Sequence, residues 1–152
     1  MQKITEAQKI ELTALIDGAM AALISQGRPS VDKEKDENGT YNCYYRENGD
    51  ANCEVRCFVG HLILDQHYTY NCEMKAVTAD PVKKALMLSG IDLDLCTNPL
   101  DSTSSVLFML GEAQDIHDKA SDGITWEAIT HKLEDWREDW AEKGLLLPKQ
   151  NC

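Results

Sequence analysis

Several features that would assign the 152-residue sequence to a familiar class are missing from it. No stretch approaches the ~18 consecutive apolar residues of a membrane-spanning helix, so we expect no membrane partner. The N-terminus, MQKITEAQKIEL, has neither an apolar core nor a small-residue cleavage site and predicts no secretory signal. There is no glycine-rich phosphate loop and no G-x-S-x-G nucleophile motif. These absences favour a cytoplasmic protein without the usual motifs of nucleotide-binding or hydrolytic enzymes.

Basic residues are scarce relative to acidic ones. The sequence has 15 lysines and arginines against 26 aspartates and glutamates, which gives a formal net charge of −11. A surface of this sign repels phosphate backbones and anionic lipids, so non-specific nucleic-acid binding is not expected. The charge suits a protein partner with a basic surface, although it also keeps a protein soluble without any partner.

The six cysteines occur without a secretory signal. Disulfides form mainly in exported proteins, because the cytoplasm keeps thiols reduced. We therefore expect free thiols and no disulfide framework. The length predicts one domain, 1–152, which buries roughly 70% of its unfolded surface and needs no covalent staple.

Caps and apolar spacing predict about five helices. The first begins at a capping box formed by Thr5 and Gln8 and ends near Gly27. Apolar residues at helical spacing give its expected buried stripe: Leu12, Leu15, Ile16, Ala19 and Leu23. A short buried helix follows at 58–63, where Gly60 permits close approach of another backbone.

Three further helices are expected in the second half of the chain. Asp80 as N-cap and Pro81 begin the third, whose apolar face includes Leu88. The fourth begins near Asp101 or Ser102. Thr125 caps the last helix, whose apolar stripe is Trp126, Ile129, Leu133, Trp136 and Trp140. Its opposite face is acidic, with Glu127, Glu134, Asp135, Glu138, Asp139 and Glu142.

A β-hairpin is predicted between the first two helices. The segment 41–46 is rich in tyrosine, and Asn48-Gly49 is a strong signal for a two-residue type I′ turn. Such a turn would place Tyr44 opposite Cys53 and Asn42 opposite Val55. The expected fold is therefore a mainly helical α+β domain with one small hairpin.

Two groups of motifs occur in a fixed order along the chain. Cys43-x-Tyr45-Arg46, a glycine turn and the run from Cys57 to Ile63 precede Asp65 and Tyr68, and Leu110 to Asp118 precedes Trp126. In this order they resemble a family of small, uncharacterised phage, prophage and bacterial proteins with the patterns C-x-Y-R…G…C-A-x-G-x-L-I and L-x-x-L-Q-x-x-H-D. Phe58, Ala113 and a few additional residues around Cys53 depart from the family. The resemblance implies a phage-linked origin, host-cell cytoplasm and a shared fold, but no mechanism.

Cys53, Cys57 and His61 are the candidate metal ligands. Their four-residue spacing would place them on one face of a helix, and His67 and Cys72 could complete a tetrahedral zinc site. The spacing matches no common zinc motif, and cysteines in small cores usually pack as apolar residues. We therefore predict no bound metal and no other cofactor.

His117 and Cys57 are the candidates for catalysis. His117 lies on an apolar stripe, which favours a core histidine bonded to a backbone carbonyl or a tyrosine over an acid–base group. Cys57 lies at a predicted helix start, where the dipole favours a thiolate and His61 follows one turn later, but burial argues against this role. His67-Tyr68-Thr69 is a single H-x-T triplet, whereas two-histidine phosphoesterases carry two. The sequence assigns no catalytic residue and favours a non-enzymatic protein.

We expect a phage-derived accessory protein that acts by binding a host or defence protein with a basic surface. One alternative is a pocket for a small ligand such as a nucleotide, formed by Tyr45, Arg46, His61 and His117; another is a small enzyme that uses His117 or Cys57. Arg46 has a rigid fork of donors that suits a carboxylate or phosphate, and a structural ion pair is the favoured role. A deep pocket lined by these four residues would favour the alternatives. The sequence predicts no oligomeric state.

Overall fold

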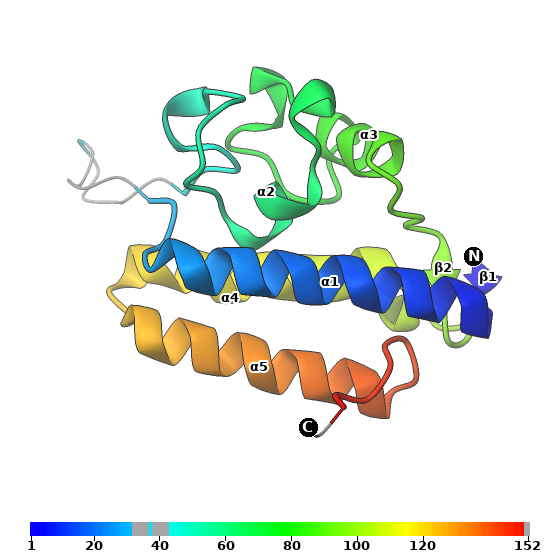
Figure 1. The fold of residues 1–152 in the computed structure, drawn as a ribbon. Coiled ribbons are helices and arrows are strands. Elements are labelled where there is room, and N and C mark those ends of the chain that lie inside the picture. Colours follow the sequence, from blue (N-terminus) through cyan, green and yellow to red (C-terminus); the bar gives the residue numbers. More distant parts are fainter. Residues whose placement is uncertain (32–36, 38–42, 151–152) are drawn as a thin grey trace.

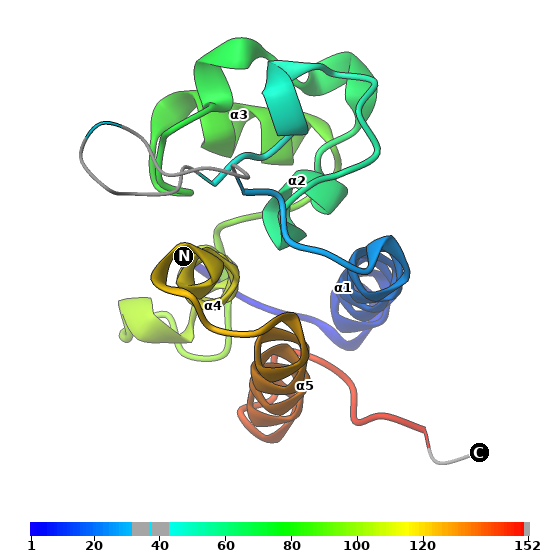
Figure 2. The same cartoon turned by 90° about the vertical axis from the view of Figure 1, so that its left-hand side faces the viewer.

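Five α-helices and two short strands make up the regular structure of residues 1–31, 37 and 43–150, which the computed structural model describes. Three long helices, α1 (Glu6–Gln26), α4 (Val106–Asp118) and α5 (Trp126–Glu142), lie alongside one another, with α5 beneath the pair formed by α1 and α4 (Figures 1 and 2). A second layer lies over α1 and α4 and contains α2 (Phe58–Leu62) and α3 (Asp80–Leu88). The predicted mainly helical α+β class is confirmed.

The strands β1 (Gln2–Lys3) and β2 (Leu95–Cys96) pair in parallel and join the N-terminus to the segment before α4. The sequence did not predict them, because two residues are too few to show an alternating pattern. Single turns of 3₁₀-helix connect the remaining elements: Glu47–Gly49, Asp65–His67, Tyr70–Cys72, Ser102–Ser104 and Lys119–Asp122. Among the described residues, no helix combines the length and the apolar character needed to cross a membrane.

The predicted β-hairpin is wrong. Asn48-Gly49 belongs to the 3₁₀ turn Glu47–Gly49 and not to a two-residue turn between strands. The carbonyl oxygen of Tyr44 accepts a hydrogen bond from the Cys57 amide at 3.2 Å, so Tyr44 faces Cys57 and not Cys53. Positions 41 and 42 of the expected strand lie outside the described residues, and so does the pairing of Asn42.

A buried carboxylate explains why no strand forms at 43–46. Glu73, only 6% exposed, accepts hydrogen bonds from the backbone amides of Tyr45 and Arg46 at 2.8 and 3.0 Å. An antiparallel partner would need such amides for its ladder. Because the carboxylate uses both donors, this segment is fixed by a side chain distant in sequence.

The long helices begin largely as the sequence predicts. The capping box of α1 is confirmed, with Thr5 and Gln8 exchanging hydrogen bonds of 3.0 and 3.2 Å, and Thr125 caps α5. Two other predicted starts are wrong. Asp80 is the first residue of α3 and does not cap it, and α4 is capped by Ser105 because 102–104 first form a 3₁₀ turn.

The core lies between the two layers and along α5. Trp136 is 4% exposed, and its indole donates to the carbonyl oxygen of Met109 at 3.1 Å. Its ring forms a T-shaped pair with Phe58, with centroids 5.3 Å apart. The predicted stripe of α5 is therefore confirmed as a core face. Leu15 and Leu88 were predicted to be buried, but they are 42% and 54% exposed.

Candidate functional site

Arg46 is fully buried and is bonded within the protein. Its guanidinium donates to the carbonyl oxygens of Gly60 and Ile63, at the C-terminal end of α2, and to the carboxylate of Asp65 at 3.2 Å. The last carbonyls of a helix have no partner within the helix, so the arginine satisfies them. Burial, together with the charge of Arg56, lowers the pKa of Arg46. This geometry gives Arg46 a structural role, since its side chain has no exposed surface and bonds to backbone and side-chain acceptors of the protein itself.

Tyr45 is held by the same arrangement. Its amide is bonded to Glu73, and its hydroxyl donates to the carbonyl oxygen of Lys75 at 2.6 Å. The Tyr68 hydroxyl also donates to Glu73, and burial with that carboxylate raises the pKa of Tyr68. These bonds fasten segment 43–46 to segment 73–75.

His61 lies on the opposite side of α2, against the end of α1. Its Nε2 atom is 2.9 Å from the side-chain oxygen of Gln26, which also accepts the backbone amide of Arg56. Burial, with Arg56 and Arg46 nearby, lowers the pKa of His61 from its usual 6.5 to about 4. At neutral pH the ring is therefore uncharged and donates its Nε2 proton to Gln26.

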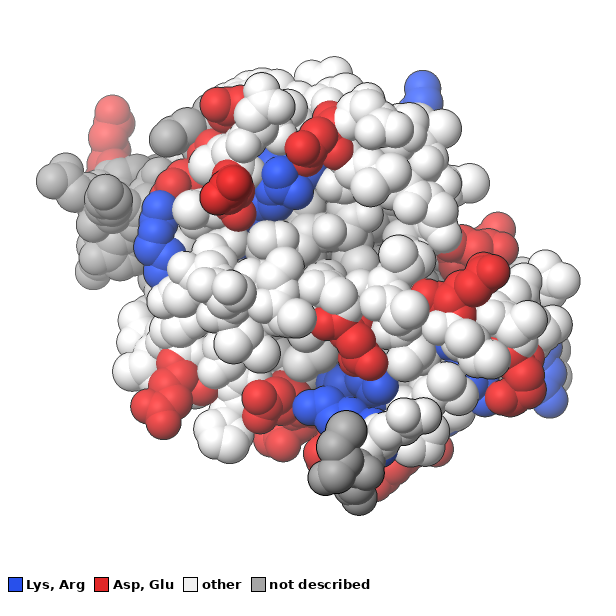
Figure 3. All heavy atoms as spheres, viewed as in Figure 1, with Lys and Arg blue, Asp and Glu red and all other residues white. Residues whose placement is uncertain are grey.

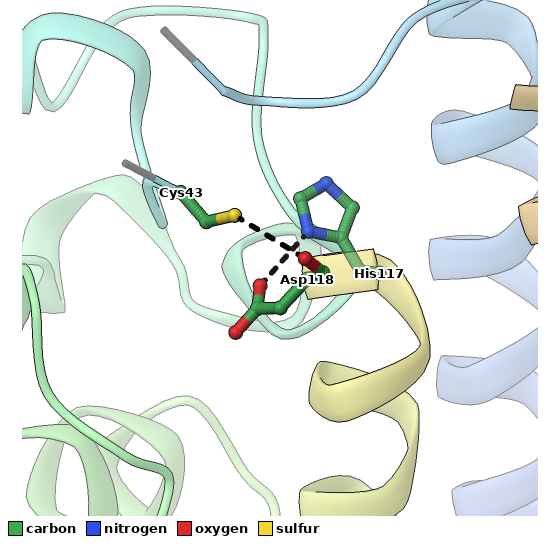
Figure 4. Close-up of side chains that lie close together, drawn as sticks. All are labelled: Cys43, His117 and Asp118. Atoms are coloured by element: carbon green, nitrogen blue, oxygen red, sulfur yellow. Dashed lines mark hydrogen bonds and ion pairs between the residues drawn. The ribbon is translucent and has the colours of Figure 1, made fainter. Parts of the chain in front are cut away.

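His117 forms the cluster that most resembles a reactive site. Its ring is fully buried near the end of α4, with Nδ1 3.2 Å from Oδ1 of Asp118, and the thiol of Cys43 lies against the carbonyl oxygen of Asp118 (Figure 4). The three potential ligand atoms lie within 4.8 Å of one another, close enough to hold a metal ion. Burial, together with Asp118, raises the pKa of Cys43 to about 12.

The tautomer of His117 argues against a metal at this cluster. The amide of Ser30 donates to Nε2 at 3.2 Å, so Nε2 carries the lone pair and Nδ1 carries the proton. A metal on Nδ1 would require the proton to move to Nε2, where it would face the Ser30 amide. The ring therefore joins the segment after α1 to α4, although its partners differ from the carbonyl or tyrosine that the sequence suggested.

The three candidate metal ligands from the sequence, Cys53, Cys57 and His61, do not form one group. Cys57 is fully buried at the start of α2, where its sulfur accepts the amide of Gly60, and burial raises its pKa. His61 faces Gln26, and Cys53 belongs to the loop before α2. The only set of three potential ligands found among the described residues is Cys43, His117 and Asp118. A raised pKa also makes Cys57 a poor nucleophile.

Two of the concave surfaces of the molecule involve α4. A cleft of about 580 Å³ lies between α4 and the segments 43–45 and 74–78. Its lining includes Cys43, Gln114 and Asp118, and Tyr45 is the only one of the four predicted ligand-binding residues in it. The side-chain oxygen of Gln114 is buried and has no hydrogen-bond partner.

The second surface is a groove of about 430 Å³ between α4 and α5, and it is acidic. Four carboxylates from both helices line it, together with two lysines and two tryptophans: Glu112, Asp115, Asp135, Asp139, Lys132, Lys143, Trp136 and Trp140. The Trp140 indole donates to Glu112 at 2.8 Å, and the ammonium of Lys143 lies 4.3 Å from the centre of the Trp140 ring. The groove therefore already holds one cation against an aromatic face.

The sequence indicated only the α5 side of this groove. The acidic face of α5 was visible from the spacing of its residues, but Glu112 and Asp115 lie on α4, where the apolar stripe dominated the pattern. Only the packing of α4 against α5 brings the two sets together. Comparisons of the chain with protein-family models, curated proteins and solved structures gave no match.

Proposed function

We propose that the protein acts by binding a partner protein, and that the groove between α4 and α5 receives a basic segment of that partner. The observation that supports this is the convergence of Glu112 and Asp115 from α4 with Asp135 and Asp139 from α5 on one groove beside Trp140. An arginine guanidinium pairs with carboxylates and stacks on an aromatic ring. The carboxylates provide the first kind of contact. The Trp140 ring is 1% exposed and lies under the Lys143 ammonium, so it provides the second kind only when that ammonium moves aside.

The nature of the partner rests on the resemblance of the motifs to phage and prophage proteins. A phage-derived accessory protein would meet host or defence proteins, so a host protein with a basic surface is the proposed class of partner. The net charge of −11 would attract such a surface and accelerate the encounter.

A hexa-arginine peptide tests whether the groove selects basic segments. Asp135→Asn with Asp139→Asn removes two groove carboxylates, and Glu127→Gln with Glu138→Gln removes two charges of α5 that do not line the groove. Because exposed ion pairs contribute up to ~1 kcal/mol each, we expect about tenfold weaker binding for the first pair by calorimetry. The second pair should change affinity little. Equal losses would mean that the peptide responds only to total charge.

Removing Lys143 should strengthen peptide binding, whereas removing the carboxylates weakens it. Its ammonium lies over the Trp140 ring and competes with an incoming cation. Lys143→Ala should therefore bind the peptide more tightly than Lys83→Ala, which removes the same charge from α3. If both variants gain equally, the ring does not take part in binding.

A small-ligand pocket is the second candidate function. The cleft of about 580 Å³ has the size of many ligand sites, and Tyr45 lines it. Arg46 and His117 are buried in structural bonds, which removes two of the groups expected to hold a nucleotide. Native mass spectrometry of protein purified from expressing cells would reveal a retained small molecule, and its absence together with peptide binding would favour the groove.

A further inference from the structure

A further hollow, of about 510 Å³, lies between α3 and the 3₁₀ turns before it. Its lining shares no residue with the groove between α4 and α5. One side is a face of α3, where Asp80, Lys84 and Leu88 follow one another at one-turn spacing. The other side is formed by residues within 66–71. Hollows of this size hold small organic molecules in many proteins.

Hydrogen bonds fasten the two sides of this hollow together at both ends of α3. At the beginning of the helix, the thiol of Cys72 donates to the carbonyl oxygen of Pro81 at 3.5 Å. At its end, the hydroxyl of Ser89 accepts the backbone amide of Leu64 at 2.9 Å. The hollow is therefore held open by the fold, as preformed ligand sites are.

The triplet His67-Tyr68-Thr69 supplies part of the turn side. Tyr68 is 8% exposed and donates its hydroxyl to Glu73, whereas the residues on either side of it, His67 and Thr69, both line the hollow. The ring of His67 has no hydrogen-bond partner among the described residues. Each of its nitrogens can therefore bond to a ligand.

Two opposite charges line the hollow without pairing. Asp80 precedes Lys84 by one turn of α3, which is the order that favours an ion pair along a helix. Within the described part of the chain, however, neither side chain forms an ion pair or a hydrogen bond. Apolar atoms of Ala85 and Leu88 lie in the same lining. The hollow thus offers an acceptor, a cation and an apolar surface together.

We propose that this hollow binds a small zwitterion, an α-amino acid with an apolar side chain. Its ammonium pairs with Asp80, its carboxylate pairs with Lys84 and accepts from His67, and its side chain lies on Leu88. An α-amino acid carries its two charges on neighbouring carbons, so one molecule can reach both side chains of a single helical turn. Asp80 repels a simple anion and Lys84 repels a simple cation, so the pair favours a ligand that has both charges.

The charge around α3 suits such a ligand. The helix contains two lysines and one aspartate, in a chain whose net charge is −11. Figure 3, drawn in the orientation of Figure 1, shows mainly uncharged atoms at the upper right, where α3 lies. A zwitterion has no net charge, so the acidic total does not repel it. This inference is independent of the groove proposed for a partner protein.

L-Phenylalanine is the probe, and two analogues separate its charges. Hydrocinnamate has the carboxylate without the ammonium, and phenethylamine has the ammonium without the carboxylate. Binding is followed by the backbone amide signal of Ala85 in ¹H–¹⁵N spectra, because Ala85 is in the lining. We expect a saturable shift with phenylalanine. Since an exposed ion pair contributes up to ~1 kcal/mol, both analogues should bind about fivefold more weakly.

Substitutions assign each charge to its partner. Asp80→Asn should abolish the preference for phenylalanine over hydrocinnamate, and Lys84→Gln should abolish the preference over phenethylamine. Lys83→Gln is the matched control, because it removes the same charge from α3 at a position outside the lining, and it should keep the wild-type affinity.

Three results would overturn the proposal. The first is the absence of a saturable shift up to the solubility limit of phenylalanine. The second is an analogue that binds as tightly as phenylalanine, which would mean that one of the two charges takes no part. The third is an equal loss of affinity in Lys83→Gln and Lys84→Gln, which would assign the effect to total charge.

Discussion

Gly60 packs directly against the carbonyl oxygen of Tyr45, and a β-carbon at Gly60 would overlap that oxygen. The same two segments are joined by Arg46, whose guanidinium donates to the carbonyl oxygen of Gly60. Segment 43–46 and helix α2 thus meet backbone to backbone at Gly60. A larger residue at position 60 can be accommodated only if one backbone moves.

Gly60→Ala should therefore destabilise the protein. Overpacking against a backbone costs about 1–3 kcal/mol, and the better helix propensity of alanine offsets at most about 1 kcal/mol of this. We expect a net loss of about 2 kcal/mol in urea unfolding. Gly111→Ala, at a helical glycine with open space, should be neutral or slightly stabilising. Equal behaviour of the two variants would mean that the close contact at Gly60 does not exist in solution.

Arg46→Ala should lower stability without a separate binding defect. The substitution leaves the buried carbonyl oxygens of Gly60 and Ile63 without their donor, and we expect a loss of about 3–5 kcal/mol. Arg56→Ala also loses an ion pair to Asp65, but at the surface, and should cost about 1 kcal/mol. Hexa-arginine binding by Arg46→Ala should fall only in proportion to the unfolded fraction. A variant with a near-normal melting temperature that no longer binds the peptide would instead mean that Arg46 contacts the ligand.

Trp136→Ala tests the packing of α5 on α4. The side chain fills the core beside Phe58 and satisfies the carbonyl oxygen of Met109. Truncating a buried tryptophan costs about 3–5 kcal/mol, and we expect a loss in that range by urea denaturation. A loss below about 1 kcal/mol would contradict the core position of this residue.

His61 should make stability depend on pH. Its pKa is about 4 when folded, against 6.5 when unfolded, so the unfolded chain binds more protons between these values. Stability from this group is complete above pH 6.5 and is lost as the pH falls towards 4. The ring is partly exposed, so we expect a contribution of about 1–3 kcal/mol.

His61→Gln isolates this effect from the carboxylates that titrate in the same range. Urea unfolding at pH 7 and pH 4.5 should show a smaller loss of stability in the variant than in the wild type. The same loss in both proteins would mean that the folded pKa of His61 is close to its ordinary value.

The helices could be predicted because their signals are local. The capping box of Thr5, the Thr125 cap and the tryptophan spacing of α5 each lie within a few residues, and the structure confirms them. The hairpin failed for the opposite reason. Tyr45 and Arg46 donate their amides to Glu73, 28 and 27 residues away, and no local pattern reveals such a bond.

The candidate sites were predictable only in part. Arg46 and His117 were singled out by motif position, but their buried partners, the carbonyl oxygen of Gly60 and the amide of Ser30, come from distant segments. In the fold, the polar groups that could have contacted a ligand are hydrogen-bonded to the backbone instead.

The indole N–H signals of the tryptophans test the binding groove most directly. Trp140 donates to Glu112 within the groove, whereas Trp126 does not line it and serves as an internal reference. During titration with hexa-arginine, an incoming guanidinium should compete for Glu112. The ¹H–¹⁵N spectrum should then show a saturable shift of the Trp140 signal, while the Trp126 signal stays in place. Binding that leaves Trp140 unmoved, or that moves Trp126 instead, would contradict the groove between α4 and α5 as the partner site.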